Sequence, residues 1–107
     1  MMDHEKTLAL GDQIIERLKR VFDPEIPVNI YDLGLIYNIS IDKDSVAHIT
    51  MTLTAPNCPV AESLPVEVRD SVNQIQGISD CVVEITFDPP WTKDMMSEEA
   101  MLDLGFL

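Results

Sequence analysis

Two stretches of alternating apolar and polar residues, separated by a short polar turn, occupy the middle of the 107-residue chain. The first runs from Leu35 to Asp42 and the second from Ala47 to Ala55, with "DKDS" supplying turn residues between them. A period of two is typical of a strand with one face in the core and the other toward solvent. The pattern therefore predicts an antiparallel β-hairpin whose polar face carries threonines and His48.

Helical spacing is found on either side of this hairpin. From Thr7 to Phe22, apolar residues recur every three or four positions, which predicts an amphipathic helix. Asp23-Pro24 marks its end, because a proline disfavours helical geometry in the residue before it. Near the other end of the chain, Ser97 can cap a short last helix.

Between these elements, the spacing predicts a second long helix and a third strand. The helix ends near Gly77, but its start is open, either at Pro59 or near Ser63, because Pro65 would lose a hydrogen bond deep in a helix. The third strand ends at the sequence "FDPPW". The residues expected to face the core from this strand are Cys81, Val83, Ile85 and Phe87.

The predicted order of elements is α-β-β-α-β-α, in a single domain over residues 1–107. This order is typical of a two-layer α+β fold, in which a small mixed sheet containing the antiparallel hairpin packs against the helices. The other face of the sheet could stay wet or pair with a second copy of the chain, so a homodimer remains open.

The charge of the chain argues against several classes of partner. Seven basic and 19 acidic residues give a net charge of −12, which repels nucleic-acid phosphates and anionic lipid surfaces. The sequence has no apolar run of about 18 residues, and its N-terminus lacks the pattern of a signal peptide. We therefore expect a cytoplasmic protein that binds neither nucleic acid nor membrane.

The two cysteines have different surroundings in the sequence. Cys81 falls in line with the core-facing residues of the third strand, so we expect it to pack as a small hydrophobic residue. Cys58 belongs to no apolar period and lies in a strand-to-helix loop. If Pro59 is the first helical residue, Cys58 is the N-cap, where the helix dipole lowers the pKa of a thiol. Such a thiolate could attack or bind metal; the alternative is that Cys58 fills a loop pocket.

A few polar and aromatic side chains are further candidates for function. Asp23, Glu25 and Asp32 precede the first strand and could converge on a metal ion or a basic partner, although capping and turn formation also explain Asp23 and Asp32. Trp91 follows two prolines and is either an exposed recognition residue or one that closes the end of the core. His48 has no evident orienting partner, so we expect it to be solvated.

Three separated motifs, "DPEIPVNIYDLGLIY", "MTLTAPNCP" and "FDPPW", give the chain a close resemblance to a family of small iron-sulfur assembly factors that includes SufT and PaaD. The chain is most similar to stand-alone SufT-like members, since it has no cysteine-rich C-terminal extension of the PaaD type. The resemblance implies a compact α/β fold. It also assigns an acidic loop to Asp23-Pro24-Glu25, a turn to Asp32-Leu33-Gly34, a cysteine motif to Cys58-Pro59 and a strand-end signature to Pro89-Pro90-Trp91.

The resemblance further implies an accessory, non-enzymatic role in assembling iron-sulfur clusters or delivering them to client proteins, with Cys58 as the functional cysteine. A cluster is usually held by four cysteine ligands, and only Cys58 is placed to be one here. We therefore expect a transient contact with a cluster that carrier, scaffold or client proteins also hold. Two alternatives are a non-catalytic adaptor for an oxygenase or assembly complex, and a thiol enzyme with Cys58 as its nucleophile.

Overall fold

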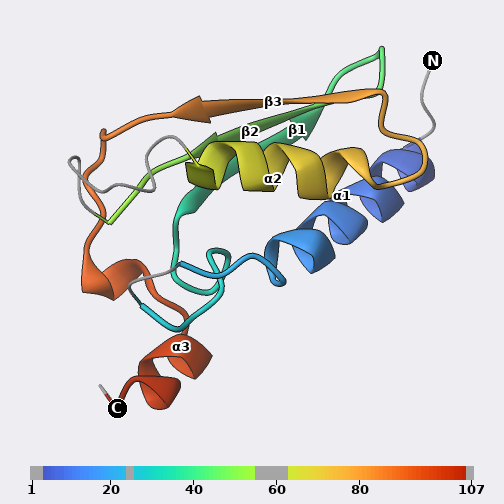
Figure 1. Ribbon diagram of the computed structural model, residues 1–107. Helices are drawn as coiled ribbons and strands as arrows, with labels where there is room; N and C mark the ends of the chain where they lie inside the picture. The colour runs from blue at the N-terminus through green and yellow to red at the C-terminus, as the bar shows by residue number, and fades with distance from the viewer. Residues whose placement is uncertain (1–3, 24–25, 55–62, 106–107) are drawn as a thin grey trace.

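The computed structural model describes residues 4–23, 26–54 and 63–105, which form two layers (Figure 1). One layer is a three-stranded sheet, and the other is a pair of helices, α1 and α2, on one face of that sheet. Helix α1 contacts β1, and α2 contacts both α1 and β3. The elements in chain order are α1 (His4–Leu18), β1 (Ile36–Ile41), β2 (Val46–Met51), α2 (Ser63–Asn73), β3 (Asp80–Ile85), the 3-10 helix η2 (Lys93–Met95) and α3 (Glu98–Asp103).

The sheet has the strand order β1-β2-β3, so β1 and β3 are its two edges. Strands β1 and β2 pair antiparallel, as the hairpin pattern predicts, and β2 pairs parallel with β3. The register places Ile39 opposite Ile49 and Ala47 opposite Cys81, so core-facing residues of all three strands lie in rows. The predicted two-layer α+β fold with a small mixed sheet is therefore confirmed.

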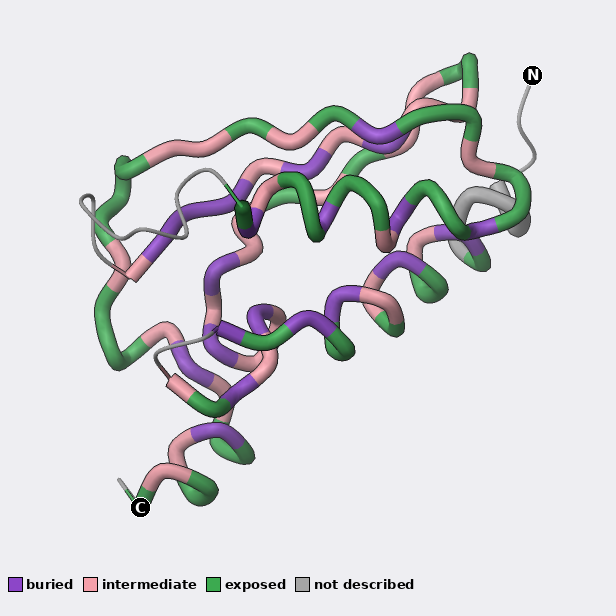
Figure 2. Tube along the Cα trace, viewed as in Figure 1, coloured by how far each residue is buried: buried purple, intermediate pink, exposed green. Residues whose placement is uncertain are grey.

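The core lies between the sheet and the two long helices, and Figure 2 shows that each of these helices has its buried positions along one side and its exposed positions along the other. Each helix contributes residues four positions apart, as an amphipathic helix with one buried face requires. Among the described residues, no helix combines the length and the apolar character needed to span a membrane. The buried residues at the centre of this core are Leu10, Ile14 and Leu18 from α1, Leu64, Val68 and Val72 from α2, and Ala47, Ile49 and Met51 from β2.

The predicted end of the first helix is wrong by one turn, because α1 ends at Leu18 and not at Phe22. Val21 is still buried in the core, which is why the helical spacing of apolar residues continues past the end of the helix. Its carbonyl oxygen accepts a hydrogen bond from the N–H of Ile30 at 2.9 Å, and Phe22 forms a β-bridge with Asn29. The chain thus folds back on itself there, and this extended pairing replaces the last helical turn.

Two side-chain orientations also differ from the predicted alternation. Phe87 lies beyond the end of β3 and is 44% exposed, whereas the sequence pattern places it in the core. Thr52 lies just beyond β2 and is fully buried, whereas the pattern places it on the polar face. Alternation between faces holds only while the backbone stays in a regular strand, so it fails at both strand ends.

Within the described part of the chain, α2 begins at Ser63, which is one of the two starts that the sequence allows. Pro65 is then in the first turn, where backbone N–H groups have no acceptor inside the helix, so its missing donor costs little. Residues 55–62 are not among those described. The predicted helix cap at Cys58 therefore stays a prediction.

Candidate functional site

Two of the sequence motifs, far apart in the chain, are joined by hydrogen bonds at one end of the sheet. The indole N–H of Trp91 donates to the carbonyl oxygen of Leu33 at 2.7 Å, and the backbone N–H of Ser97 donates to the carbonyl oxygen of Asp32 at 2.8 Å. Trp91 is half-buried and packs against the core. Of the two roles considered for this residue, closing the end of the core agrees with these contacts.

Gly34 allows this close approach. Its φ of +86° lies in the left-handed region that favours glycine, and a Cβ atom there would collide with the carbonyl oxygen of Met95. The hydroxyl of Tyr37, shortly after the turn, donates to the carbonyl oxygen of Pro89 at 2.7 Å. The turn at 32–34 and the segment 89–97 therefore form one packed unit.

The structure describes the third motif, "MTLTAPNCP", as far as Thr54, and these first residues lie in the same region. The backbone N–H of Thr52 donates to the carbonyl oxygen of Leu35 at 2.8 Å, directly after the turn. The N–H of Thr86, shortly before "DPPW", donates to the carbonyl oxygen of Met51 at 2.9 Å. Parts of all three motifs thus converge at this end of the sheet, from which the chain continues toward Cys58.

Thr52 is a buried polar residue whose position the sequence pattern missed. Its side chain is fully buried, and its Oγ1 atom has no hydrogen-bond partner in the structure as described. An unpaired buried hydroxyl costs about 1–3 kcal/mol. The only signal in the sequence is that Thr52 stands where the strand alternation gives way to the proline-rich loop.

The described acidic residues of the first motif stabilise turns. Asp23 is 3% exposed, and its Oδ1 atom accepts a hydrogen bond from the N–H of Ile26 at 3.1 Å. Asp32 and Asn29 bond each other twice, since the Asn29 side-chain N–H donates to Asp32 Oδ2 at 2.8 Å and the Asp32 N–H donates to Asn29 Oδ1 at 2.9 Å. These contacts agree with the capping and turn-forming roles considered for both aspartates.

No metal site is formed by the described residues alone, since they contain no group of three or more His, Cys, Asp or Glu side chains that could hold an ion. Glu25 and Cys58 lie outside the described ranges. The suggested convergence of Asp23, Glu25 and Asp32 on a metal therefore stays a prediction.

Cys81 is a structural residue, as the sequence pattern predicts. Its side chain is 2% exposed and belongs to the core. Burial, with a smaller contribution from the charge of Asp80, raises the pKa of the Cys81 thiol to about 11. At neutral pH this thiol is protonated, so it is a poor nucleophile and a poor metal ligand.

His48 has an orienting partner, so the contrary expectation from the sequence is wrong. Its Nε2 atom lies 2.9 Å from Oδ2 of Asp42, because the turn after β1 brings the aspartate back over β2. The hydrogen bond with His48 holds the pKa of the Asp42 carboxyl below its ordinary value. His48 follows Ala47 in β2, and successive residues of a strand face opposite sides of the sheet. Because Ala47 is buried beside Cys81, His48 faces the side of the sheet away from that thiol.

These features define a small two-layer α+β domain whose motif residues gather at one end of the sheet. The sequence profile of a family described as "Iron-sulfur cluster assembly protein" matches residues 11–85. The chain belongs to this family, and the resemblance predicted from the three motifs is confirmed.

Individual relatives agree with this membership. A protein of Porphyromonas gingivalis named "Fe-S protein maturation auxiliary factor" is 54% identical over 94% of this chain and 95% of its own length. The Staphylococcus aureus "Fe-S protein maturation auxiliary factor SufT" is 41% identical over 79% of this chain and 97% of its own. A crystal structure of the domain of unknown function DUF59 from Bacillus anthracis superposes with a TM-score of 0.89 at 31% identity, covering 98% of this chain and 100% of that one.

Proposed function

We propose that this protein is a cytoplasmic accessory factor that helps to assemble iron-sulfur clusters or to deliver them to client proteins, with the Cys58 thiolate as a transient contact. The observation that carries the proposal is the convergence of three family motifs at one end of the sheet, from which the chain leads to Cys58. Relatives covered over nearly their whole length are named Fe-S protein maturation auxiliary factors, which supports the same role.

The small number of available cysteine thiols favours a transient contact with a cluster over stable storage of one. Iron-sulfur clusters are usually held by four cysteine thiolates, and the chain has two cysteines. Cys81 is buried and protonated, which leaves Cys58 as the one thiol available. The remaining ligands would come from a carrier, scaffold or client protein, or from Cys58 of a second copy. A bond shared in this way can be released during handover.

The role is non-enzymatic in this proposal. A catalytic thiol is activated by an adjacent base or by a lowered pKa, and proton transfer to a leaving group needs an acid or base close to it. The one described histidine with a carboxylate partner, His48, faces away from the helix-covered side of the sheet and bonds Asp42. This arrangement gives no support to the alternative of a thiol enzyme.

The proposal is tested by replacing the chromosomal copy with wild type, Cys58→Ser or Cys81→Ala, and measuring the activity of iron-sulfur enzymes per amount of enzyme protein. We expect Cys58→Ser to fold normally by circular dichroism while client activity falls. Cys81→Ala, the matched control, should retain client activity. Full client activity with Cys58→Ser would contradict the proposal, and retained partner binding in that case would favour the adaptor alternative.

A further inference from the structure

The outer edge of β3 presents unpaired backbone groups. In a parallel pair, every second residue of a strand hydrogen-bonds to the neighbouring strand. Because the N–H of Thr86 donates to the carbonyl oxygen of Met51, the even-numbered residues of β3 bond to β2. The odd-numbered residues Cys81, Val83 and Ile85 therefore direct their N–H and C=O groups outward, away from β2. A strand with such a row of unpaired groups is a template for pairing with another chain.

One of these outward groups is already occupied. The N–H of Cys81 donates to Oδ1 of its neighbour Asp80 at 2.8 Å. In the described structure, the outward N–H groups of Val83 and Ile85 have no such acceptor. The part of the edge open to an added strand is therefore its second half.

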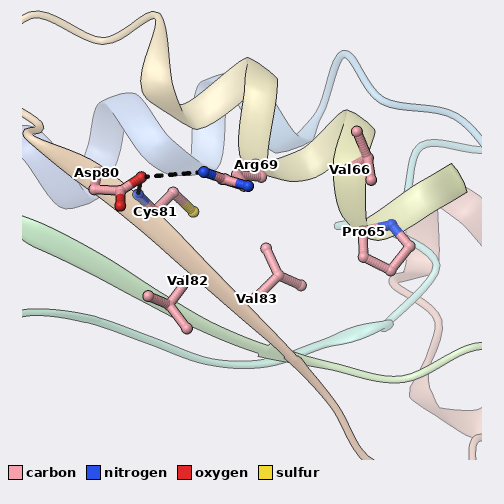
Figure 3. Close-up of a pocket in the computed structure, with 7 residues that line it drawn as sticks. All are labelled: Pro65, Val66, Arg69, Asp80, Cys81, Val82 and Val83. Atoms are coloured by element: carbon pink, nitrogen blue, oxygen red, sulfur yellow. Dashed lines mark hydrogen bonds and ion pairs between the residues drawn. The ribbon is translucent and has the colours of Figure 1, made fainter. Parts of the chain in front are cut away.

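A groove runs beside this edge, between β3 and α2 (Figure 3). It has a volume of about 330 Å³ and is lined from α2 by Pro65, Val66 and Arg69, and from β3 by the residues from Asp80 to Val83. Val66 and Val82 are 56% and 47% exposed. The volume is at the small end of the range for ligand pockets, so the groove suits the side chains of an extended chain better than an enclosed cofactor.

The other edge of the sheet is built differently. Strand β1 has a register shift, of the kind a β-bulge produces, between Ile36 and Asn38. Bulges are one of the devices by which edge strands resist pairing with other chains. Strand β3, in contrast, keeps an uninterrupted register with β2 from Asp80 to Ile85. Of the two edges, β3 is thus the one shaped for an added strand.

The charges around the groove indicate what kind of chain fits it. Exposed acidic side chains lie on both elements: Asp80 lines the groove, Asp70 follows Arg69 on α2, and Glu84 lies further along β3. The basic side chain lining it is Arg69, which lies 3.9 Å from the Asp80 carboxylate. A second copy of the chain would bring the same acids and a net charge of −12, which disfavours pairing between copies. A basic chain is complementary.

We propose that the groove between β3 and α2 binds an extended segment of a partner protein, rich in lysine or arginine, which adds as a strand to the outer edge of β3. The segment exchanges backbone hydrogen bonds with Val83 and Ile85 and places alternate apolar side chains over Val66. Its basic side chains lie on the other face, beside Glu84. The site does not include the cysteine motif, so this proposal is independent of the role of Cys58.

The test is a titration of the ¹⁵N-labelled protein with a nine-residue peptide that alternates valine and lysine, followed by NMR. We expect shift changes confined to β3 and α2, and slower hydrogen exchange of the Val83 and Ile85 amides when the peptide is bound. Val66→Lys should weaken binding about tenfold. Leu102→Lys, an equally apolar and exposed position on α3, should not change binding.

Two control peptides separate strand addition from simple charge attraction. A peptide with glutamate in place of lysine, and one with its strand-pairing amides N-methylated, should each bind at least about tenfold more weakly than the original peptide. Equal binding of either control, unchanged binding by Val66→Lys, or shift changes centred on β1 would overturn the proposal. So would concentration-dependent dimerisation that Val66→Lys abolishes, because the occupant would then be a second copy.

Discussion

Burial gives the two cysteines different chemistry, and alkylation can measure it. With its pKa at about 11, Cys81 is a thiolate in about one molecule per thousand at pH 8. We therefore predict that iodoacetamide modifies Cys58 in the native protein while Cys81 reacts only after unfolding, as read by mass spectrometry of the two cysteine peptides. Faster modification of Cys81 than of Cys58 would contradict the assignment of roles.

The same shift gives Cys81 a predictable effect on stability at high pH. Its folded pKa of about 11 lies above its ordinary value of 9.0, so the folded state prefers the protonated thiol. This contribution to stability is complete below pH 9 and is lost as the pH rises through 11. In Cys81→Ala, the control, that part of the high-pH loss should be absent from denaturation curves.

The Asp42–His48 pair allows a test by titration. The hydrogen bond with His48 is the largest cause of the lowered Asp42 pKa, and bonds from the backbone of Val46 and Asp44 add to it. We predict that His48→Val raises the Asp42 pKa part of the way toward its ordinary value, as measured by NMR of the side-chain carboxyl. Thr50→Val, at the next outward position of β2, should leave the titration unchanged.

The sign of the linked stability effect follows from the direction of that shift. A lowered folded pKa stabilises the fold above the ordinary pKa of the carboxyl, and the effect is lost as the pH falls through the lowered value. Because both side chains are substantially exposed, the effect on unfolding should be small. An Asp42 titration that is identical in wild type and His48→Val would show that the pair does not form in solution.

The effect of the unpaired Thr52 hydroxyl on stability can be tested by substitution. Thr52→Val keeps the shape of the side chain and removes the buried Oγ1, so we predict unchanged stability or a gain of up to about 1 kcal/mol. Urea denaturation measures this directly. A loss of more than about 1 kcal/mol would show that the hydroxyl has a partner in solution.

At the level of elements, the contact between the turn at 32–34 and the segment 89–97 depends on Gly34. We predict that Gly34→Ala lowers the free energy of unfolding by about 3 kcal/mol, because the left-handed φ adds about 1–2 kcal/mol and the new Cβ displaces the Met95 backbone. Gly105→Ala is the matched control, since Gly105 has a φ of +79° and open space around its Cβ position. Equal losses in the two variants would mean that the turn does not pack closely against Met95.

Periodicity in the sequence predicts the elements and their core faces, because it reflects the regular geometry of helices and strands. It fails where that geometry ends. Val21 continues the helical spacing from a segment that is no longer helical, and Phe87 and Thr52 continue an alternation beyond the paired strands. Each of these errors lies within a few residues of the end of an element.

The arrangement of the candidate site could be predicted only in part. The sequence indicates that its three motifs matter, but not that Trp91 bonds Leu33, since this contact joins residues far apart in the chain. The bond between Asp42 and His48 depends on how tightly the intervening turn closes, which the residue pattern leaves open. The core role of Cys81 was predictable because it follows from strand periodicity alone.

Across the whole molecule, the family motifs and the open part of the β3 edge lie toward the same end of the sheet. The motifs gather where β2 leads toward Cys58, and β3 ends there too, since Ile85 pairs with Met51 and α2 begins at that end with Ser63 (Figure 1). A segment bound along the second half of β3 would therefore lie near the motifs that lead to Cys58. The net charge of −12 suits basic partner surfaces.

The most direct measurement is the rate of cluster transfer under anaerobic conditions, from a cluster-loaded carrier protein to an apo client enzyme, followed by recovery of the client's activity. Small amounts of wild type and of Cys81→Ala should accelerate the transfer, and Cys58→Ser should leave it at the rate seen without added protein. Equal acceleration by a correctly folded Cys58→Ser variant would contradict the claim that this thiol makes the contact.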